Sequence, residues 1–168
     1  LGTLIAGPFA GRWFADFGAE VIKIEHPETG DPLRRWGENA GGDESLWHLV
    51  QSRGKRSVAA DLHDPADQEF VRRLALESDL LIENFRPGVM ARLGLDYPTL
   101  AAEVPRLVYA SISGFGQTGP WAGKGGFELV ARGVSGIMSV AGEPGRPPVK
   151  AGIPVTDLGA GLFALSGI

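Results

Sequence analysis

Two hydrophobic patterns alternate along the chain. Aromatic side chains recur at helical spacing in residues 6–17, whereas residues 20–25 alternate apolar and polar side chains as a strand does. Strands are predicted at residues 20–25, 56–62, 79–83 and 106–113. Helices are predicted at residues 6–17, 46–50, 65–77, 87–93, 97–103 and 126–138, and from about residue 157 onward. This alternation favours an α/β fold with a mostly parallel sheet.

The composition argues against several classes of function. The 168 residues fit one domain, and a net charge of -4 with no run of more than two Lys or Arg argues against a nucleic-acid or anionic-membrane surface. The absence of cysteine excludes disulfides, thiolate catalysis and Cys-based metal sites, and three scattered histidines argue against a His-rich metal site. We therefore expect a protein without a bound metal and without a nucleic-acid or membrane partner.

The two ends of the chain add further expectations. The chain begins at Leu1 without Met and without a charged-then-apolar leader, which favours a cytoplasmic location. The apolar stretch 151–168 is interrupted by Pro154 and Asp157 and is rich in Gly, so it is not expected to span a membrane. Residues 158–168 contain no C-terminal stop signal, so we expect the chain to be a piece of a longer polypeptide.

Glu25 is a first candidate for chemistry, because it ends a predicted strand. It follows a helix whose start carries Gly7 and Gly11, and in a dinucleotide-binding fold such a carboxylate would bind a ribose hydroxyl. The glycine fingerprint of that fold is missing, and Pro8 fits the first position of a helix instead. The simpler interpretation of Glu25 is a solvated strand end.

Residues 83–88 (ENFRPG) are a second candidate, since they follow a buried strand and start a short helix. Backbone N–H groups and Arg86 could face an anion there, and Arg92 adds a second positive charge. Asn84 could bond an amide or a base edge, and Phe85 could stack on a ring. The alternative is an ordinary strand-to-helix turn with Phe85 in the core.

Asp157 is a third candidate, because it is the one charged residue in residues 151–168. A carboxylate there is either a helix N-cap or a reactive group that the backbone amides at the helix start keep ionised. Gly159 and Gly161 would let a bulky ligand or a second backbone approach the first turn. A carboxylate can also act as a covalent nucleophile towards an activated acyl group.

Six sequence blocks occur in an order that is typical of a known family. They are residues 6–8 (AGP), 19–25 (AEVIKIE) with Gly30 and Asp31, 55–57 (KRS), 83–88 (ENFRPG), 113–120 (SGFGQTGP) and 157–161 (DLGAG). Together they resemble the class III CoA-transferases, the CaiB–BaiF group that includes formyl-CoA and carnitine CoA-transferases. The match extends over effectively the whole chain. Each block is common by itself, but the six in order are highly specific.

The resemblance implies a Rossmann-like large domain that linkers join to a small domain, in a homodimer whose two chains interlock. Residues 1–168 would then be the N-terminal part of the large domain. The opening strand, the small domain, the C-terminal return and the glycine-rich loop over the active site would be absent, so the chain alone should be inactive. The implied substrates are an acyl-CoA and a carboxylic acid, with no permanently bound cofactor.

The resemblance also assigns residues. Asp157 matches the family's nucleophile, which attacks an acyl-CoA to form a mixed anhydride and then an aspartyl-CoA thioester. The residues that match coenzyme A contacts are Ile5, Ala6, His26, Asn84, Phe85, Arg86, Arg92, Gly125, Gly126, Phe127 and Glu128. His26 departs from the pattern, because some members have Arg there.

Two alternatives stay open besides the transferase. A racemase of the same family would use Asp157 as an acid or base, but the His of its His-Asp pair is missing at Phe127-Glu128. A non-catalytic CoA-binding module would bind CoA without using Asp157. The donor and acceptor acids are not indicated by the sequence, so oxalate, carnitine, succinate and aromatic acids all remain.

Overall fold

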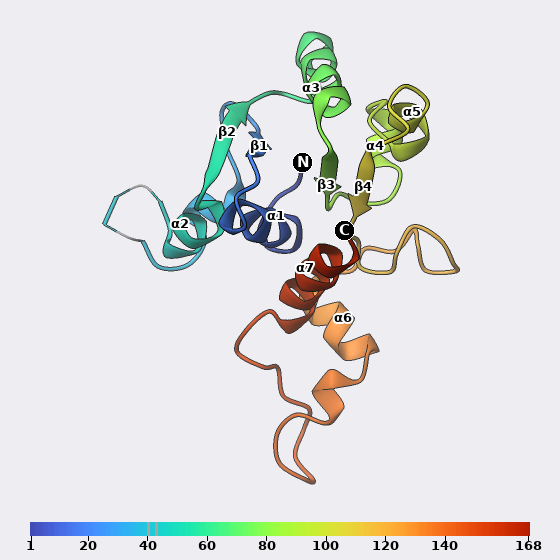
Figure 1. The fold of residues 1–168 in the computed structure, drawn as a ribbon. Helices are drawn as coiled ribbons and strands as arrows, with labels where there is room; N and C mark the ends of the chain where they lie inside the picture. The colour runs from blue at the N-terminus through green and yellow to red at the C-terminus, as the bar shows by residue number, and fades with distance from the viewer. Residues whose placement is uncertain (40, 43) are drawn as a thin grey trace.

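The structure is a computed structural model that describes residues 1–39, 41–42 and 44–168. Its strands are β1 (Val21–Glu25), β2 (Lys55–Ala59), β3 (Leu80–Glu83) and β4 (Val108–Ser111). Its α-helices are α1 (Ala6–Asp16), α2 (Leu46–Ser52), α3 (Pro65–Glu77), α4 (Val89–Arg92), α5 (Tyr97–Ala101), α6 (Glu128–Val134) and α7 (Val155–Gly167). Two short 3-10 helices are η1 (Pro32–Arg35) and η2 (Ile137–Ser139). The α/β class predicted from the sequence is confirmed (Figure 1).

The strands form two parallel pairs. In the first pair Val21 lies opposite Lys55, and in the second Leu80 lies opposite Val108. The first residues of the chain lie between the pairs, because the Leu1 nitrogen donates to Ile82 O at 2.8 Å and Lys23 Nζ donates to Gly2 O at 3.4 Å. The predicted parallel strands are therefore present, as β1–β2 and β3–β4 on either side of the N-terminal segment rather than as one continuous sheet (Figure 1).

The apolar core lies between the strands and helices α3, α4 and α5. Its buried members are Ile24, Ala60, Val71, Ala75, Leu81, Met90, Leu95, Leu100 and Leu107. Helix α3 starts as predicted, since the Asp64 carboxylate accepts from the N–H groups of Ala66 and Asp67 with Pro65 in the first turn. Among the described residues no helix is long and apolar enough to cross a membrane.

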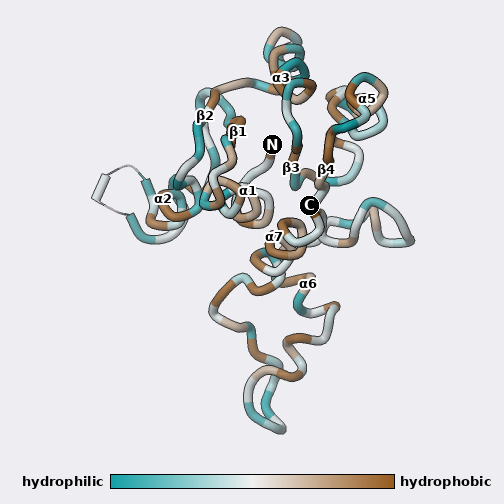
Figure 2. The backbone as a smooth tube through the Cα atoms, in the orientation of Figure 1, coloured by the Kyte–Doolittle hydropathy of each residue, from teal (hydrophilic) through white to brown (hydrophobic). Residues whose placement is uncertain are grey.

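Helices α1 and α7 pack against each other (Figure 1). Their backbones meet at Gly161, where a Cβ atom would lie 2.8 Å from Phe9 Cδ1 and 3.1 Å from Ala6 O. Gly159 has open space instead, with no atom within 4 Å of a built Cβ. The sequence predicted that these glycines admit either a bulky ligand or a second backbone. Gly161 admits a second backbone, that of α1. Helix α7 is apolar (brown in Figure 2), and Phe163 on it is 82% exposed.

Several boundaries differ from the sequence-based expectation by a few residues, and two of the differences concern the C-terminal part of the chain. The helix predicted at residues 126–138 is interrupted, because Gly136 adopts a left-handed φ of 80° between α6 and η2. Helix α7 begins at Val155 with Pro154 at its N-cap, so Asp157 lies inside the first turn. The interpretation of Asp157 as a helix N-cap is therefore wrong.

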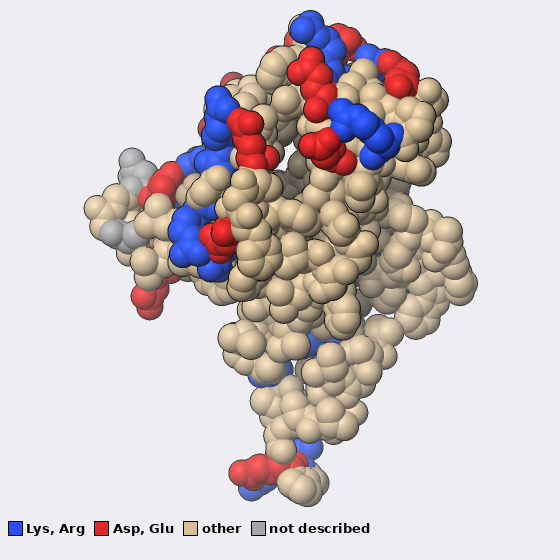
Figure 3. Space-filling model, viewed as in Figure 1, with Lys and Arg blue, Asp and Glu red and all other residues tan. Residues whose placement is uncertain are grey.

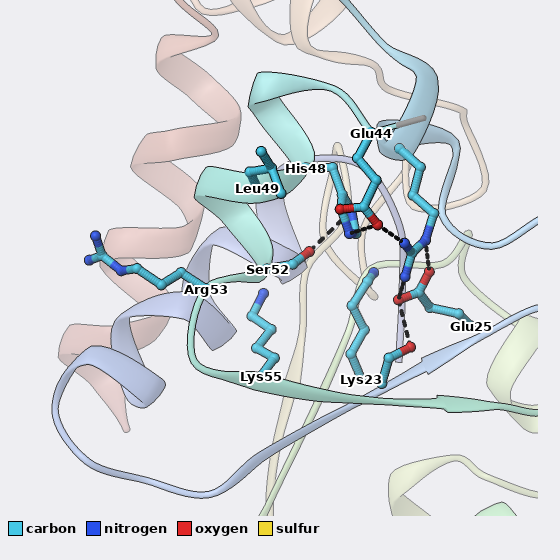
Figure 4. Close-up of a pocket in the computed structure, with 10 residues that line it drawn as sticks. Lys23, Glu25, Glu44, His48, Leu49, Ser52, Arg53 and Lys55 are labelled. Carbon is cyan, nitrogen blue, oxygen red and sulfur yellow. Dashed lines mark hydrogen bonds and ion pairs between the residues drawn. The ribbon is translucent and has the colours of Figure 1, made fainter. Parts of the chain in front are cut away.

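A layer of charged side chains lies on one face of the β1–β2 pair. A cavity of about 300 Å³ opens there, lined by Lys23, Glu25 and Lys55 from the strands and by His48 and other residues of α2 and its flanks (Figure 4). Glu25 is only 7% exposed and accepts from Arg34 Nε at 2.8 Å and from the Ser57 hydroxyl. The interpretation of Glu25 as a solvated strand end is therefore wrong, and its bonds leave it poorly placed for a ribose.

The pKa values in this layer follow from these contacts. Burial alone would raise the pKa of Glu25, but hydrogen bonds from Arg34, the Asp31 N–H and Ser57 outweigh it and lower the pKa to about 2. Lys55 is in the opposite situation, because its ammonium donates to Pro8 O at 2.5 Å and forms no ion pair with a described carboxylate. Burial, together with the charge of Lys23, lowers the pKa of Lys55 to about 7.

The helix contact at Gly161 leads to a first prediction. Gly161→Ala is expected to lower the free energy of unfolding by about 1–3 kcal/mol, because the new methyl group overlaps Phe9 and the α1 backbone. Gly159→Ala is the matched control in the same helix, and it is expected to be neutral or stabilising by up to about 1 kcal/mol. Denaturant unfolding of the complete protein measures both. Equal effects of the two substitutions would contradict this assignment.

Lys55 leads to a second prediction. Between pH 7 and 10.5 the unfolded chain keeps a proton at Lys55 that the folded protein has released, so this residue makes stability rise with pH across that window. Lys55→Met is expected to flatten the rise and to stabilise the protein at neutral pH. Lys150→Met, at an exposed lysine, should keep the rise. Urea unfolding at several pH values measures the slope, and an unchanged slope in Lys55→Met would rule out a buried ammonium.

Candidate functional site

A cleft of about 320 Å³ lies where β3 and β4 end, between the starts of α1 and α7. Ten of the twelve residues expected from the sequence line it: Ile5, Ala6, Asn84, Phe85, Arg86, Gly125, Gly126, Phe127, Glu128 and Asp157. They come from four separate parts of the chain. Their convergence follows the general rule that ligands bind at the carboxyl ends of parallel strands.

Asp157 is half-buried in this cleft, in the first turn of α7. Burial raises the pKa of its carboxyl, the nearby charge of Glu128 raises it further, and Arg132 opposes both. This direction is opposite to that expected from the helix start alone. Within the described parts of the chain no group donates a hydrogen bond to the carboxylate, which therefore stays available for a ligand.

Glu128 lines the cleft beside Asp157, and Arg132 is buried behind it. They are one turn apart on α6 and are joined by an ion pair. Arg132 is completely buried, and its Nη1 donates to Ala151 O at 2.6 Å. The Thr156 hydroxyl donates to Glu128 O at 3.2 Å. The start of α6 is thus connected to the start of α7 at the position of the carboxylate.

The Asn84 side chain is engaged within the protein. Its Oδ1 accepts from the Thr3 N–H at 3.0 Å, and its Nδ2 donates to Thr3 O at 2.9 Å. The segment before α1 lies so close that a Cβ on Gly2, which has a φ of +126°, would be 1.9 Å from Asn84 Oδ1. These bonds use much of the amide that was expected to face an amide or base edge. Asn84 instead holds the start of α1 against the end of β3.

Leu4 lies in the same segment and has a left-handed φ of 62°, which is strained for a residue with a side chain. The Leu4 N–H donates to Asp31 Oδ1 at 3.1 Å. The other oxygen of Asp31 forms an ion pair with Lys23. The Lys23–Asp31 pair therefore holds the segment at one edge of the cleft.

Three side chains of the cleft differ in how available they are to a ligand: Arg86, Phe85 and Phe127. Arg86 lies beside the loop before α6, with Nη2 3.7 Å from a Cβ built on Gly125, and no described carboxylate forms an ion pair with it. Phe85 packs partly against the apolar core, as the alternative interpretation expected. Phe127 is 70% exposed at the cleft. The cleft thus presents one unpaired guanidinium and one exposed ring.

Two expected residues lie outside the cleft lining. His26 follows β1 on an exposed turn, where its Nδ1 accepts from the Glu28 N–H at 3.2 Å. Arg92 lies in the last turn of α4. Their assignment to coenzyme A stays a prediction.

Lys124 and Arg132 were not singled out from the sequence. Lys124 lines the cleft, with its ammonium 4.6 Å from the centre of the Trp121 ring. A signal for each existed, because Lys124 is the one charged residue in residues 107–127 and Arg132 the one in residues 129–142. The isolated charges alone do not show that Lys124 lies at the surface of the cleft and that Arg132 is buried behind it.

The sequence profile of CoA-transferase family III matches residues 1–168. Succinate–glutarate CoA-transferase of Agrobacterium fabrum is 45% identical over 174 residues, a match that covers 100% of the chain and 44% of that protein. Succinyl-CoA:glutarate CoA-transferase of Homo sapiens is 40% identical over 168 residues, which covers 100% of the chain and 38% of that protein.

The fold is shared with a solved structure. The crystal structure of a CAIB/BAIF family protein from Brucella suis superposes with a TM-score of 0.93 and 42% sequence identity, covering 99% of the chain and 45% of that protein. The chain thus spans less than half the length of the relatives it matches. The resemblance seen in the six sequence blocks is confirmed, and the chain belongs to CoA-transferase family III.

Proposed function

We propose that the protein containing this chain moves CoA from an acyl-CoA to a carboxylic acid, with Asp157 as the nucleophile. The observation that carries the proposal is the Asp157 carboxylate, which is half-buried in the cleft and receives no hydrogen bond from the described residues. A carboxylate with little hydration is a better nucleophile than one in water. Membership of a CoA-transferase family supports the same reaction.

The reaction proceeds through covalent intermediates on Asp157. Its oxygen attacks the acyl carbonyl of the donor, the carbon–sulfur bond breaks, and CoA leaves as a thiolate, which gives a mixed anhydride between Asp157 and the acyl group. The thiolate then attacks the aspartyl carbonyl, which releases the donor acid and leaves an aspartyl-CoA thioester. The acceptor carboxylate displaces CoA to form a second anhydride, and CoA attacks its acyl carbon to restore Asp157. No step uses water, so the energy of the thioester is kept.

The cleft supplies groups for such substrates. Arg86 and Lys124 carry positive charges that suit the phosphates of CoA or a substrate carboxylate, and Phe127 offers an exposed ring. The relatives are named for succinyl-CoA, succinate and glutarate, which favours a dicarboxylic acid as donor and acceptor. We propose succinyl-CoA as the first donor to test.

The remaining half of the protein is part of the proposal. The relatives are more than twice as long as the chain, and we propose that the complete protein is an interlocked homodimer and that the chain alone is inactive. Exposed apolar side chains support further packing, with Phe163 on α7 82% exposed and Val140 after η2 86% exposed. In Figure 3 charged side chains gather over α2, the β1–β2 pair and α3, whereas the surface over α7 is largely uncharged.

Two other functions are less well supported. A racemase needs an acid and a base on either side of the substrate's α-carbon, and the described cleft offers Asp157 and Glu128 but no His. A CoA-binding module would not need an unpaired half-buried carboxylate. Exchange of the α-hydrogen in heavy water would favour the racemase, and binding of CoA without any adduct would favour the module.

The nucleophile is tested by intact-mass analysis of the complete protein after incubation with succinyl-CoA. We expect a CoA-sized, hydroxylamine-labile adduct on the peptide that contains Asp157. Asp157→Asn keeps the size of the side chain but removes the nucleophile, so it should form no adduct and lose at least about 10³-fold in kcat. Asp96→Asn, a carboxylate outside the cleft lining, is the control. An adduct that persists in Asp157→Asn would rule out this mechanism.

The pH dependence follows from the same carboxylate. Attack requires ionised Asp157, and burial together with Glu128 raises its pKa, so the rate should fall with decreasing pH at a value above the usual aspartate range. Glu128→Gln removes the neighbouring charge and should shift this acidic limb of the pH profile to lower pH. The pH profile of kcat/KM measures both. A limb that stays in place in Glu128→Gln would show that another group controls it.

A further inference from the structure

Arg132 is the most deeply buried charged side chain among the described residues, with no exposed surface. Its Nε forms an ion pair with Glu128, its Nη1 donates to Ala151 O at 2.6 Å, and its Nη2 donates to Ile153 O. A guanidinium without water needs such partners for its five N–H groups. The planar head therefore joins one carboxylate and two backbone carbonyls in a fixed arrangement.

The partners of Arg132 come from two parts of the chain, the segment that leads into α7 and helix α6. Ala151 and Ile153 belong to the connection between η2 and α7, which forms no helix or strand, and Asp157 follows Ile153 by four residues. Glu128 lies in the cleft lining with Asp157. A shift of the two carbonyls would therefore move the first turn of α7 relative to the cleft.

The charge of Arg132 also reaches Asp157. Glu128 raises the pKa of the Asp157 carboxyl, and Arg132 lowers it. The other charged groups of the cleft lining are Arg86 and Lys124, and the residues that α1 and its preceding segment contribute are uncharged. Without Arg132, an unneutralised Glu128 would face Asp157 from the same wall.

We propose that Arg132 is a positioning residue for Asp157, which fixes the segment leading into α7 by its two carbonyl bonds and neutralises Glu128 by its ion pair. This inference rests on the proposed function of Asp157. The side chain then has two separable tasks. Its fork of N–H donors fixes the position of the segment, and its charge neutralises Glu128. Lysine would keep the charge but cannot bond three partners in one plane.

The test uses the complete protein with succinyl-CoA and three variants: Arg132→Met, Arg132→Lys and the double variant Arg132→Met with Glu128→Gln. We measure the single-turnover rate of adduct formation, the KM for succinyl-CoA and the acidic limb of the pH profile. Arg132→Met should lower the rate about 10²-fold with KM changed less than about threefold, because misplacement affects the reacting group more than remote binding. Its acidic limb should move to higher pH.

The other variants separate the two tasks. Arg132→Lys should return the acidic limb to the wild-type position while the rate stays reduced. The double variant should also return the limb, because the unneutralised carboxylate is gone. Arg146→Met, an exposed arginine in the same connection, is the control for general effects on that segment and should match the wild type.

Each result decides the inference. A wild-type rate and limb in folded Arg132→Met would overturn it, as would a limb that the double variant fails to restore. Should Arg132→Met not fold, Arg132→Lys decides alone, and a wild-type rate in that variant would exclude the positioning role. Absence of an adduct in the wild type would instead reject the proposed function, so the two failures are distinguishable.

Discussion

The contact between α1 and α7 at Gly161 determines where the cleft can form. It places Ile5 and Ala6, near the beginning of the chain, against the first turns of a helix near its end. Because position 161 has no side chain, the α1 backbone at Ala6 can lie close to α7, as the cleft between the two helix starts requires. The carboxyl ends of β3 and β4 then supply the third side, and residues 124–128 supply the fourth.

Around this contact, two polar networks hold the walls of the cleft. On one side the Lys23–Asp31 pair bonds the backbone of Leu4, and Asn84 bonds the backbone of Thr3. On the other side Arg132 bonds the backbone that leads into α7. In each case a side chain from one element bonds the irregular backbone of another. Among the described residues Asp157 receives no hydrogen bond, while the segments around it are bonded to one another.

Local patterns predicted most of the helices and strands, because caps and periodicity act over a few residues. Asp64 and Pro65 start α3 as expected, and the isolated charge of Asp157 was sufficient to select it from the sequence. Tertiary contacts could not be predicted in this way. The alternation in β1 suggested a solvated Glu25, but the α2 side of the strand is covered and the carboxylate is buried. The burial of Arg132 likewise depends on two carbonyls about twenty residues away in sequence.

The packing of Gly161 on Ala6 also has a consequence for the order of folding. Contact between residues this far apart in sequence closes a very long loop, so we expect it to form after the local contacts of the α3–α5 core. During synthesis the core can assemble while α7 is still inside the ribosome, since its members lie between Ile24 and Leu107. We therefore expect the cleft to be completed late, when α7 emerges and covers α1, and the face of α1 that Gly161 covers to stay exposed until then.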